Sequence, residues 1–155
     1  MKTLFALWTV ICGLLAAAPA SACSFEQPPR ARAESCNRLL ARSINFGNML
    51  DHAREGMAGP ALRDEFIELT AKAGFTAIRL PIRWDAQAAD KPPYTIDAEF
   101  FARIDGVVKL ALQHQLAIVL DMHHYTAMMS EPDTERARFL VRCWERIARL
   151  LLPES

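Results

Sequence analysis

The chain has 155 residues, with 18 basic and 18 acidic side chains and a formal net charge of zero at pH 7. A polyanion-binding surface needs an excess of basic residues, so this balance argues against a nucleic-acid partner. The hydrophobic share of 52% fits an ordinary α/β protein.

The first 22 residues have the pattern of a secretory signal peptide. Lys2 precedes an apolar stretch from Leu4 to Ala18, and the small residues Ala20-Ser21-Ala22 follow. The apolar stretch is shorter than the ~20 residues that cross a bilayer, so no membrane span is predicted. We therefore expect residues 1–22 to be removed and the mature chain to be exported to the periplasm or the outside of the cell.

Three cysteines remain after this removal, and an odd number cannot pair fully within one chain. Cys23 and Cys36 could close a small loop in an oxidising compartment. Cys23 could instead carry a lipid anchor, because a Cys directly after the signal peptide resembles a lipoprotein signal, and lipidation would exclude the disulfide. Cys143 lies beside the apolar stripe of a predicted helix and is expected to be a buried free thiol.

Residues 23–42 are rich in Pro, Arg, Ala and Ser and have no apolar period, which predicts an arm or linker. From residue 43 onward, strands alternate with helices, which predicts parallel strands joined by right-handed crossovers. The predicted strands are Ser43–Phe46, Ile78–Ile82 and Leu116–Met122, and the predicted helices are Pro60–Ala73, a helix capped by Asp97 that reaches Leu112, and Thr134–Leu152.

Each predicted helix carries apolar residues at steps of three or four, and Gly74 is expected to end the first helix. The residues expected to face the sheet are Leu62, Phe66, Leu69 and Ala73 on the first helix, Phe100, Phe101, Ile104, Val107, Val108, Ala111 and Leu112 on the second, and Ala137, Leu140, Val141, Trp144, Ile147, Ala148 and Leu151 on the third.

Alternation along the strands predicts one apolar and one polar face for the sheet. Asn45, Arg79, and Asp121 with His123 lie opposite the bulky apolar residues, so these polar groups of three strands should gather on one side. Arg79 needs an anionic partner there, and Asp121 on the adjacent strand is one candidate. Asp121 and His123 could also ligate a metal, but no third or fourth ligand accompanies them in the sequence, so no metal site is predicted.

Four ordered motifs resemble the amino-terminal part of family 5 glycoside hydrolases, the family of many bacterial cellulases. The motifs are Ser43-Ile44-Asn45-Phe46-Gly47-Asn48-Met49-Leu50-Asp51, Ala73-Gly74-Phe75, Pro93-Tyr94-Thr95-Ile96-Asp97 and Asp121-Met122-His123-His124-Tyr125. The resemblance implies that residues 43–155 form the first three strand–helix units of a (β/α)8 TIM barrel. Such a barrel needs roughly 250 residues, so the α/β fold is expected to be incomplete.

The resemblance also implies roles for individual side chains. Arg79 would hydrogen-bond the nucleophilic Glu of a complete enzyme, and His123 and His124 would contact the sugar just before the cleaved bond. Asn48 and Asp51 would bind a more distant sugar, although the family usually has Glu at the second position. Alternatively, the turn that contains Asn48 simply closes the first strand.

Two aromatic residues, Trp84 and Tyr125, lie just past strand ends, where a ring could stack on the apolar face of a sugar. A core-packing role is the alternative for Trp84. The chain contains neither the Asn-Glu-Pro motif that carries the family's acid/base nor the motif of its nucleophile. The chain alone is therefore expected to be inactive.

The sequence thus predicts the amino-terminal fragment of a secreted, retaining glycosidase that acts on a β-1,4-glucan-like polysaccharide or oligosaccharide. No cofactor is expected. Two alternatives from other classes remain open: a non-catalytic carbohydrate-binding protein of the cell envelope, and a metal-dependent hydrolase on a related barrel.

Overall fold

The computed structural model describes residues 28–124 and 134–151, with only the backbone described for 134–136 and 146–151. Strands and helices alternate along the described chain, as predicted. The elements are helix α1 (Pro29–Leu40), strand β1 (Ser43–Asn45), helix α2 (Asp64–Lys72), strand β2 (Ala77–Ile82), the 3-10 helix η2 (Trp84–Gln87), helix α3 (Ala98–Gln113), strand β3 (Ala117–Met122) and helix α5 (Thr134–Leu151).

The three strands form one parallel sheet in the order β1-β2-β3. Asn45 lies opposite Arg79 in the first pair, and Arg79 lies opposite Val119 in the second. The backbone pairing continues past the strand ends, because Leu50 bridges Ile82 in parallel fashion. The carboxyl ends of all three strands therefore lie at one edge of the sheet, and the segments that follow them start there.

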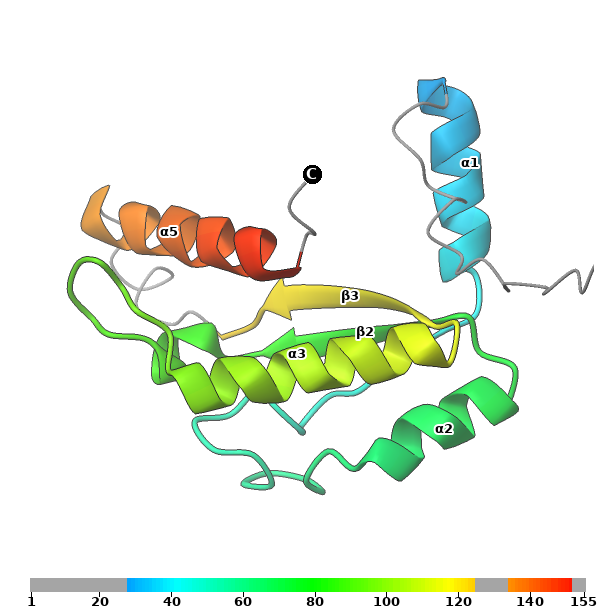
Figure 1. Ribbon diagram of the computed structural model, residues 1–155, viewed down its shortest axis with the longest axis horizontal. Helices are drawn as coiled ribbons and strands as arrows, with labels where there is room; N and C mark the ends of the chain where they lie inside the picture. Colours follow the sequence, from blue (N-terminus) through cyan, green and yellow to red (C-terminus); the bar gives the residue numbers. More distant parts are fainter. Residues whose placement is uncertain (1–27, 125–133, 152–155) are drawn as a thin grey trace, which may run out of the picture.

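The apolar face of the sheet packs against helices α2, α3 and α5 (Figure 1). Along the chain, α2 follows β1, α3 follows β2 and α5 follows β3. Burial of this face is the main force that holds the sheet and helices together. The shared core includes fully buried residues of β2 and α3, namely Ile78, Leu80, Ile82, Ile104, Val107 and Ala111.

Helix α3 begins as the sequence predicts. Asp97 precedes it, and its Oδ1 accepts a hydrogen bond of 2.8 Å from the backbone N–H of Phe100. Such a cap satisfies one of the backbone donors that the first turn leaves unpaired. The predicted core positions of α3 are mostly buried, whereas Leu112 in its last turn is exposed.

We expect Asp97→Ala to lower the free energy of unfolding by about 1 kcal/mol, because the N–H of Phe100 loses its side-chain acceptor. Asp97→Asn keeps an oxygen in the same place and is the matched control. Urea unfolding of both variants measures the difference. An Ala variant as stable as the Asn variant would show that the cap contributes nothing to α3.

Helix α2 begins four residues later than predicted, and its buried face is different. Residues 60–63 are not helical, and the N–H of Leu62 donates to Glu55 Oε1 at 2.8 Å, so Leu62 enters the core from a loop. Within the helix, Ile67 and Thr70 are buried, and Phe66 is half-buried against the core as predicted, while Leu69 is 60% exposed. The predicted stop is confirmed, because Gly74 has φ 79°, a left-handed conformation that glycine adopts without strain.

Helix α5 was expected to bury a face that includes Leu140, Val141 and Trp144, and this prediction is wrong for Val141. Phe139 and Cys143, one turn apart, are buried, whereas Val141 is 56% exposed. Trp144 is half-buried and packs against the core. Cys143 is a buried free thiol, as predicted. The side chains of Ile147, Ala148 and Leu151 lie outside the described residues.

Most of the segment predicted as an arm is helical, because Pro29–Leu40 form α1. Pro29 fits the first turn of a helix, and the Ala, Arg, Glu and Leu residues that follow favour helix without supplying an apolar face. None of the residues of α1 is buried. Cys36 is disulfide-bonded. Cys23 and residues 1–22, predicted to be a signal peptide, lie outside the described residues, and no described helix is long and apolar enough to span a bilayer.

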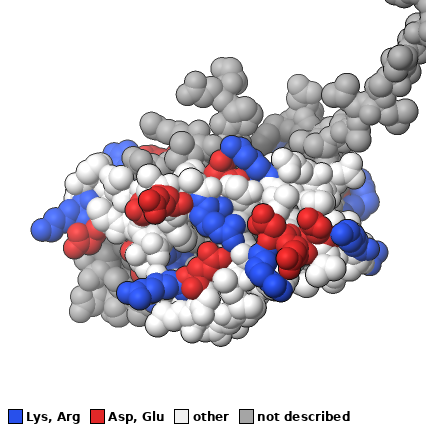
Figure 2. All heavy atoms as spheres, turned by 60° about the horizontal axis from the view of Figure 1, so that its bottom comes forward, with Lys and Arg blue, Asp and Glu red and all other residues white. Residues whose placement is uncertain are grey.

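The surface over α2 and α3 carries charges of both signs, intermingled rather than sorted into patches (Figure 2). Arg103 on α3 joins the loop after β1 to this layer through Glu55 Oε1 at 3.1 Å and the carbonyl of Leu62. The pairs Lys72–Glu68 and Lys109–Asp105 lie along single helices. Exposed pairs of this kind each contribute at most about 1 kcal/mol to stability.

Candidate functional site

Four polar side chains from the three strands meet at the carboxyl edge of the sheet, as strand alternation predicts. Arg79 Nη1 donates to Asn45 Oδ1 at 2.7 Å. Arg79 Nη2 contacts the carboxylate of Asp121 and lies 3.4 Å from His123 Nδ1. His123 follows the last residue of β3. Its backbone N–H donates to the carbonyl of Ile82 at 2.8 Å, so the pairing of β3 with β2 continues to His123.

Asp121 was one predicted anionic partner of Arg79, and the ion pair between them confirms this prediction. The Arg79 side chain is 41% exposed and that of Asp121 is 28% exposed. Solvent therefore screens the pair, and its net contribution to stability is at most about 1 kcal/mol. The pair's main effect is geometric, because a planar guanidinium held at two nitrogens by Asn45 and Asp121 has a fixed orientation.

The rings of His123 and His124 lie side by side, although consecutive residues of a regular strand point to opposite faces. Their ring centroids are 4.3 Å apart in an edge-to-face arrangement. Strand β3 ends at Met122, and His124 has φ 59°, in the left-handed region where His occurs more often than most residues. The turn therefore brings together two rings that a regular strand would place on opposite faces. The side chain of His124 is exposed to solvent.

Asn48 and Asp51 lie in the turn that follows β1. The backbone N–H of Asn48 donates to Asp51 Oδ2 at 3.0 Å, and Asn48 has φ 63°. The carboxylate of Asp51 thus closes the turn, in agreement with the alternative that this turn simply ends the first strand. Asp51 is 4% exposed, whereas Asn48 is exposed. Contact of either residue with a sugar stays a prediction.

Trp84 lies in the core, so its predicted stacking on a sugar is wrong. The side chain is 0% exposed. It packs edge-to-face on Phe100 with centroids 5.8 Å apart, and it also contacts Phe101. Trp84 starts the 3-10 helix directly after β2, and this turn directs the indole toward the first turn of α3. The alternative of core packing is confirmed, and Tyr125, the second predicted aromatic, lies outside the described residues.

His52 also lies at the site, and the sequence analysis did not identify it. Its Nε2 is 4.0 Å from Asp51 Oδ1, and its ring centroid is 6.2 Å from that of His124. Asp51, His123 and His124 each offer one atom within 4.8 Å of the others and form a group that could hold a metal ion. This group differs from the pair considered from the sequence, because it contains Asp51 and His124 and does not contain Asp121.

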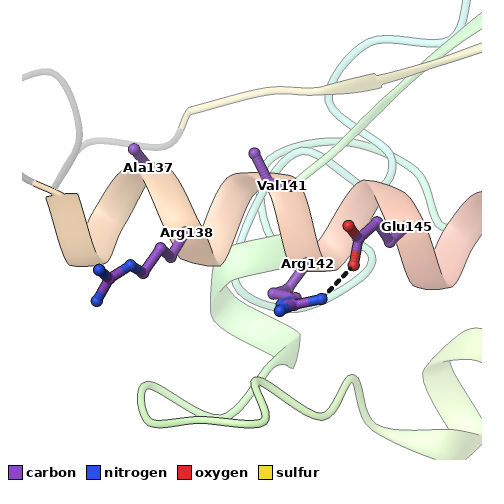
Figure 3. A pocket seen from close by; sticks show the side chains of 5 residues that line it. All are labelled: Ala137, Arg138, Val141, Arg142 and Glu145. Carbon is purple, nitrogen blue, oxygen red and sulfur yellow. Dashed lines mark hydrogen bonds and ion pairs between the residues drawn. The ribbon is translucent and has the colours of Figure 1, made fainter.

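A second feature is a surface pocket of about 280 Å³ on α5, shown in Figure 3. Its lining comes from one helix, and Arg142 Nη1 pairs with Glu145 Oε2 at 2.7 Å along it. None of the predicted site residues within the described ranges lines it. The lining residues are Ala137, Arg138, Val141, Arg142 and Glu145.

Comparison with known proteins places this geometry in a family. The family described as "Cellulase (glycosyl hydrolase family 5)" matches residues 43–154. The chain belongs to glycosyl hydrolase family 5. The resemblance stated from the four motifs is therefore confirmed.

Bacterial endoglucanases are among the relatives of this family 5 chain. Endoglucanase B of Paenibacillus lautus is 32% identical over 148 residues, which are 90% of this chain and 26% of that protein. A structure of Thermotoga maritima Cel5A in complex with cellobiose, in mutant form, is 41% identical, with a TM-score of 0.70 over 73% of this chain and 38% of that one. Another Thermotoga maritima Cel5A structure has a TM-score of 0.72 at 39% identity. The family 5 chain thus spans between about a quarter and two fifths of these proteins.

The comparisons also fix the fold. The neighbours are family 5 TIM-barrel enzymes, and the sheet β1-β2-β3 with its helices corresponds to the amino-terminal part of that barrel. In such barrels the loops at the carboxyl ends of the strands build the active site. The cluster of Asn45, Arg79, Asp121 and His123 lies at this edge.

Proposed function

We propose that this chain forms the sugar-binding wall of an exported family 5 glycosidase that hydrolyses a β-1,4-glucan-like polysaccharide. One observation carries the proposal: Arg79 is held by Asn45 and Asp121 at the carboxyl edge of the sheet, with His123 and His124 beside it. Relatives named endoglucanases, and structures of Thermotoga maritima Cel5A with cellobiose and mannotriose, support an oligosaccharide substrate.

In the complete enzyme we expect hydrolysis with retention, by a nucleophilic Glu and an acid/base Glu about 5 Å apart. The fixed guanidinium of Arg79 would donate to the nucleophilic carboxylate and keep it ionised and oriented. His123 and His124 would donate hydrogen bonds to sugar hydroxyls next to the bond that breaks. Among the described residues no Glu lies at the carboxyl end of a strand, so this part of the chain supplies binding and orientation rather than the reacting carboxylates.

The export of the protein is part of the same proposal. The signal-peptide pattern of residues 1–22 supports it. Cys36 is disulfide-bonded, which fits an oxidising compartment. Lipidation at Cys23 and a disulfide from Cys36 to Cys23 remain alternative fates of the mature amino terminus.

A hybrid enzyme tests the proposed sugar contacts. In this hybrid, residues 43–124 of the chain replace the matching strands and helices of Thermotoga maritima Cel5A, to which the chain is 41% identical. We expect His124→Ala to raise KM for a soluble β-1,4-glucan about fivefold, with little change in kcat, because one hydrogen bond contributes about 1 kcal/mol to substrate binding.

The backbone at His124 needs its own control, since φ is 59° there. His124→Gly removes the ring and suits this conformation, so it should raise KM as much as His124→Ala does. His114→Ala, at the end of α3, is the matched histidine control and should leave KM unchanged. Unchanged KM in both His124 variants would refute a sugar contact by this ring.

A further inference from the structure

Three potential metal ligands from two distant segments meet at the carboxyl edge of the sheet. Asp51 comes from the turn after β1, and His123 and His124 follow β3. One ligand atom of each lies within 4.8 Å of the others. Two imidazoles and a carboxylate are a donor set that Zn²⁺ and other divalent first-row ions prefer.

One carboxylate oxygen of Asp51 is buried without a hydrogen-bond partner among the described residues. This oxygen is Oδ1, and the Asp51 side chain is 6% exposed. His52 Nε2 lies 4.0 Å from Oδ1, beyond hydrogen-bond range. Leaving a buried carboxylate oxygen unpaired is costly. The other oxygen, Oδ2, is held by the Asn48 N–H at 3.0 Å, so Oδ1 is presented in a fixed direction.

The two imidazoles are also placed by their surroundings. His123 Nδ1 lies 3.6 Å from Asp121 Oδ1, a second buried carboxylate oxygen without a hydrogen-bond partner in the described part of the chain. The same nitrogen lies 3.4 Å from Arg79 Nη2, so Nδ1 faces the polar cluster and Nε2 is the ring nitrogen left to bind a metal. The left-handed turn at His124 sets its ring 4.3 Å from that of His123.

We propose that Asp51, His123 and His124 bind a divalent transition-metal ion, with Zn²⁺ as the representative case. Zinc ligands lie about 2.0–2.2 Å from the ion, which puts tetrahedral ligands roughly 3.4 Å from one another. The spacing of up to 4.8 Å must therefore shorten on binding, and rotation of the exposed His124 ring supplies that movement. Three protein ligands leave a fourth position open for water.

This site has a consequence for the proposed function but does not depend on it. His123 and His124 are the side chains proposed to contact sugar hydroxyls, so a bound ion would exclude the sugar. Metal binding would then act as inhibition of hydrolysis. The binding of Zn²⁺ itself requires only the three ligands, whatever the substrate of the complete enzyme is.

Isothermal titration of Zn²⁺ into the full chain tests the site. We expect one site whose Kd rises at least about tenfold in Asp51→Asn and in His124→Gly, since each removes a ligand. Both variants preserve local structure: Asn keeps an acceptor for the Asn48 N–H, and Gly suits the positive φ at position 124. His114→Gln, which changes the histidine at the end of α3, is the control and should bind Zn²⁺ as the unmodified chain does.

Two results would overturn the proposal. One is the absence of Zn²⁺ binding by the unmodified chain at millimolar metal. The other is a Kd that both variants leave unchanged, which would place bound zinc elsewhere, for example at cysteines. Urea unfolding of each variant accompanies the titration, and His124→Gly, altered at an exposed ring, gives a readout even if Asp51→Asn unfolds. Turnover by the hybrid enzyme is measured separately, so loss of the sugar role and loss of the metal site are distinguishable.

Discussion

Replacing Trp84 with Ala should lower the free energy of unfolding by about 3–5 kcal/mol, the usual cost of removing a fully buried large aromatic side chain. The indole is 0% exposed and fills the space between the end of β2 and the start of α3, where Phe100 and Phe101 contact it. The loss is large beside the 5–15 kcal/mol that stabilises a typical domain. Denaturation by urea, followed by fluorescence and circular dichroism, measures it.

Val141→Ala is the matched control for this prediction. Val141 is 56% exposed on α5, so its truncation should change the free energy of unfolding by no more than about 0.5 kcal/mol. A sugar-stacking Trp84 on the surface would behave like Val141 in this measurement. A loss below about 1 kcal/mol in Trp84→Ala would therefore contradict the core position.

Replacing Arg79 with Lys in the hybrid enzyme should lower kcat between about 10-fold and 100-fold, with KM nearly unchanged. A hydrogen bond to a charged group contributes about 1.5–3 kcal/mol, and each 1.36 kcal/mol of transition-state stabilisation is tenfold in rate. The guanidinium is held by Asn45 and Asp121 at two nitrogens, whereas an ammonium is a single point charge without a fixed plane. Lys can keep one partner but cannot orient the nucleophile at the same time.

Arg83→Lys provides the comparison for a nearby arginine. Arg83 lies just past β2 and pairs with Asp85, with Nε 3.5 Å from Oδ1, outside the cluster of Arg79. Its replacement should leave kcat within about twofold, because it makes no contact with the cluster in the described residues. Equal losses of kcat in both variants, or a rise in KM without a fall in kcat for Arg79→Lys, would refute the orienting role of Arg79.

The sheet and the polar cluster could be predicted from the sequence because both follow from a fixed geometric rule. Side chains alternate across a strand, so Asn45, Arg79 and Asp121 had to share a face once the strands were parallel and neighbouring. The cap of Asp97 on α3 was equally accessible, since Asp is a strong capping residue and a long apolar period follows it.

The parts that the sequence did not predict depend on local backbone geometry and on three-dimensional neighbours. Trp84 turns inward because a 3-10 helix starts at the end of β2, and nothing in its flanking residues fixes that turn. The residues of α5 that are buried depend on which of them meet the sheet, so Phe139 lies in the core and Val141 does not. The meeting of Asp51 with His123 and His124 joins segments about seventy residues apart through two left-handed residues, Asn48 and His124.

Hydrolysis of a soluble β-1,4-glucan by the unmodified hybrid enzyme is the most direct test of the claim that this chain supplies the sugar-binding wall of a family 5 barrel. This assignment predicts turnover by the hybrid, with kcat/KM within about tenfold of the parent enzyme, because the contacts that residues 43–124 contribute match those they replace. It also predicts no turnover by the 155-residue chain alone, since retaining hydrolysis needs two carboxylates about 5 Å apart across the bond. A hybrid that unfolds cooperatively yet hydrolyses nothing, or a lone chain whose turnover is abolished by Asp121→Asn, would contradict this assignment.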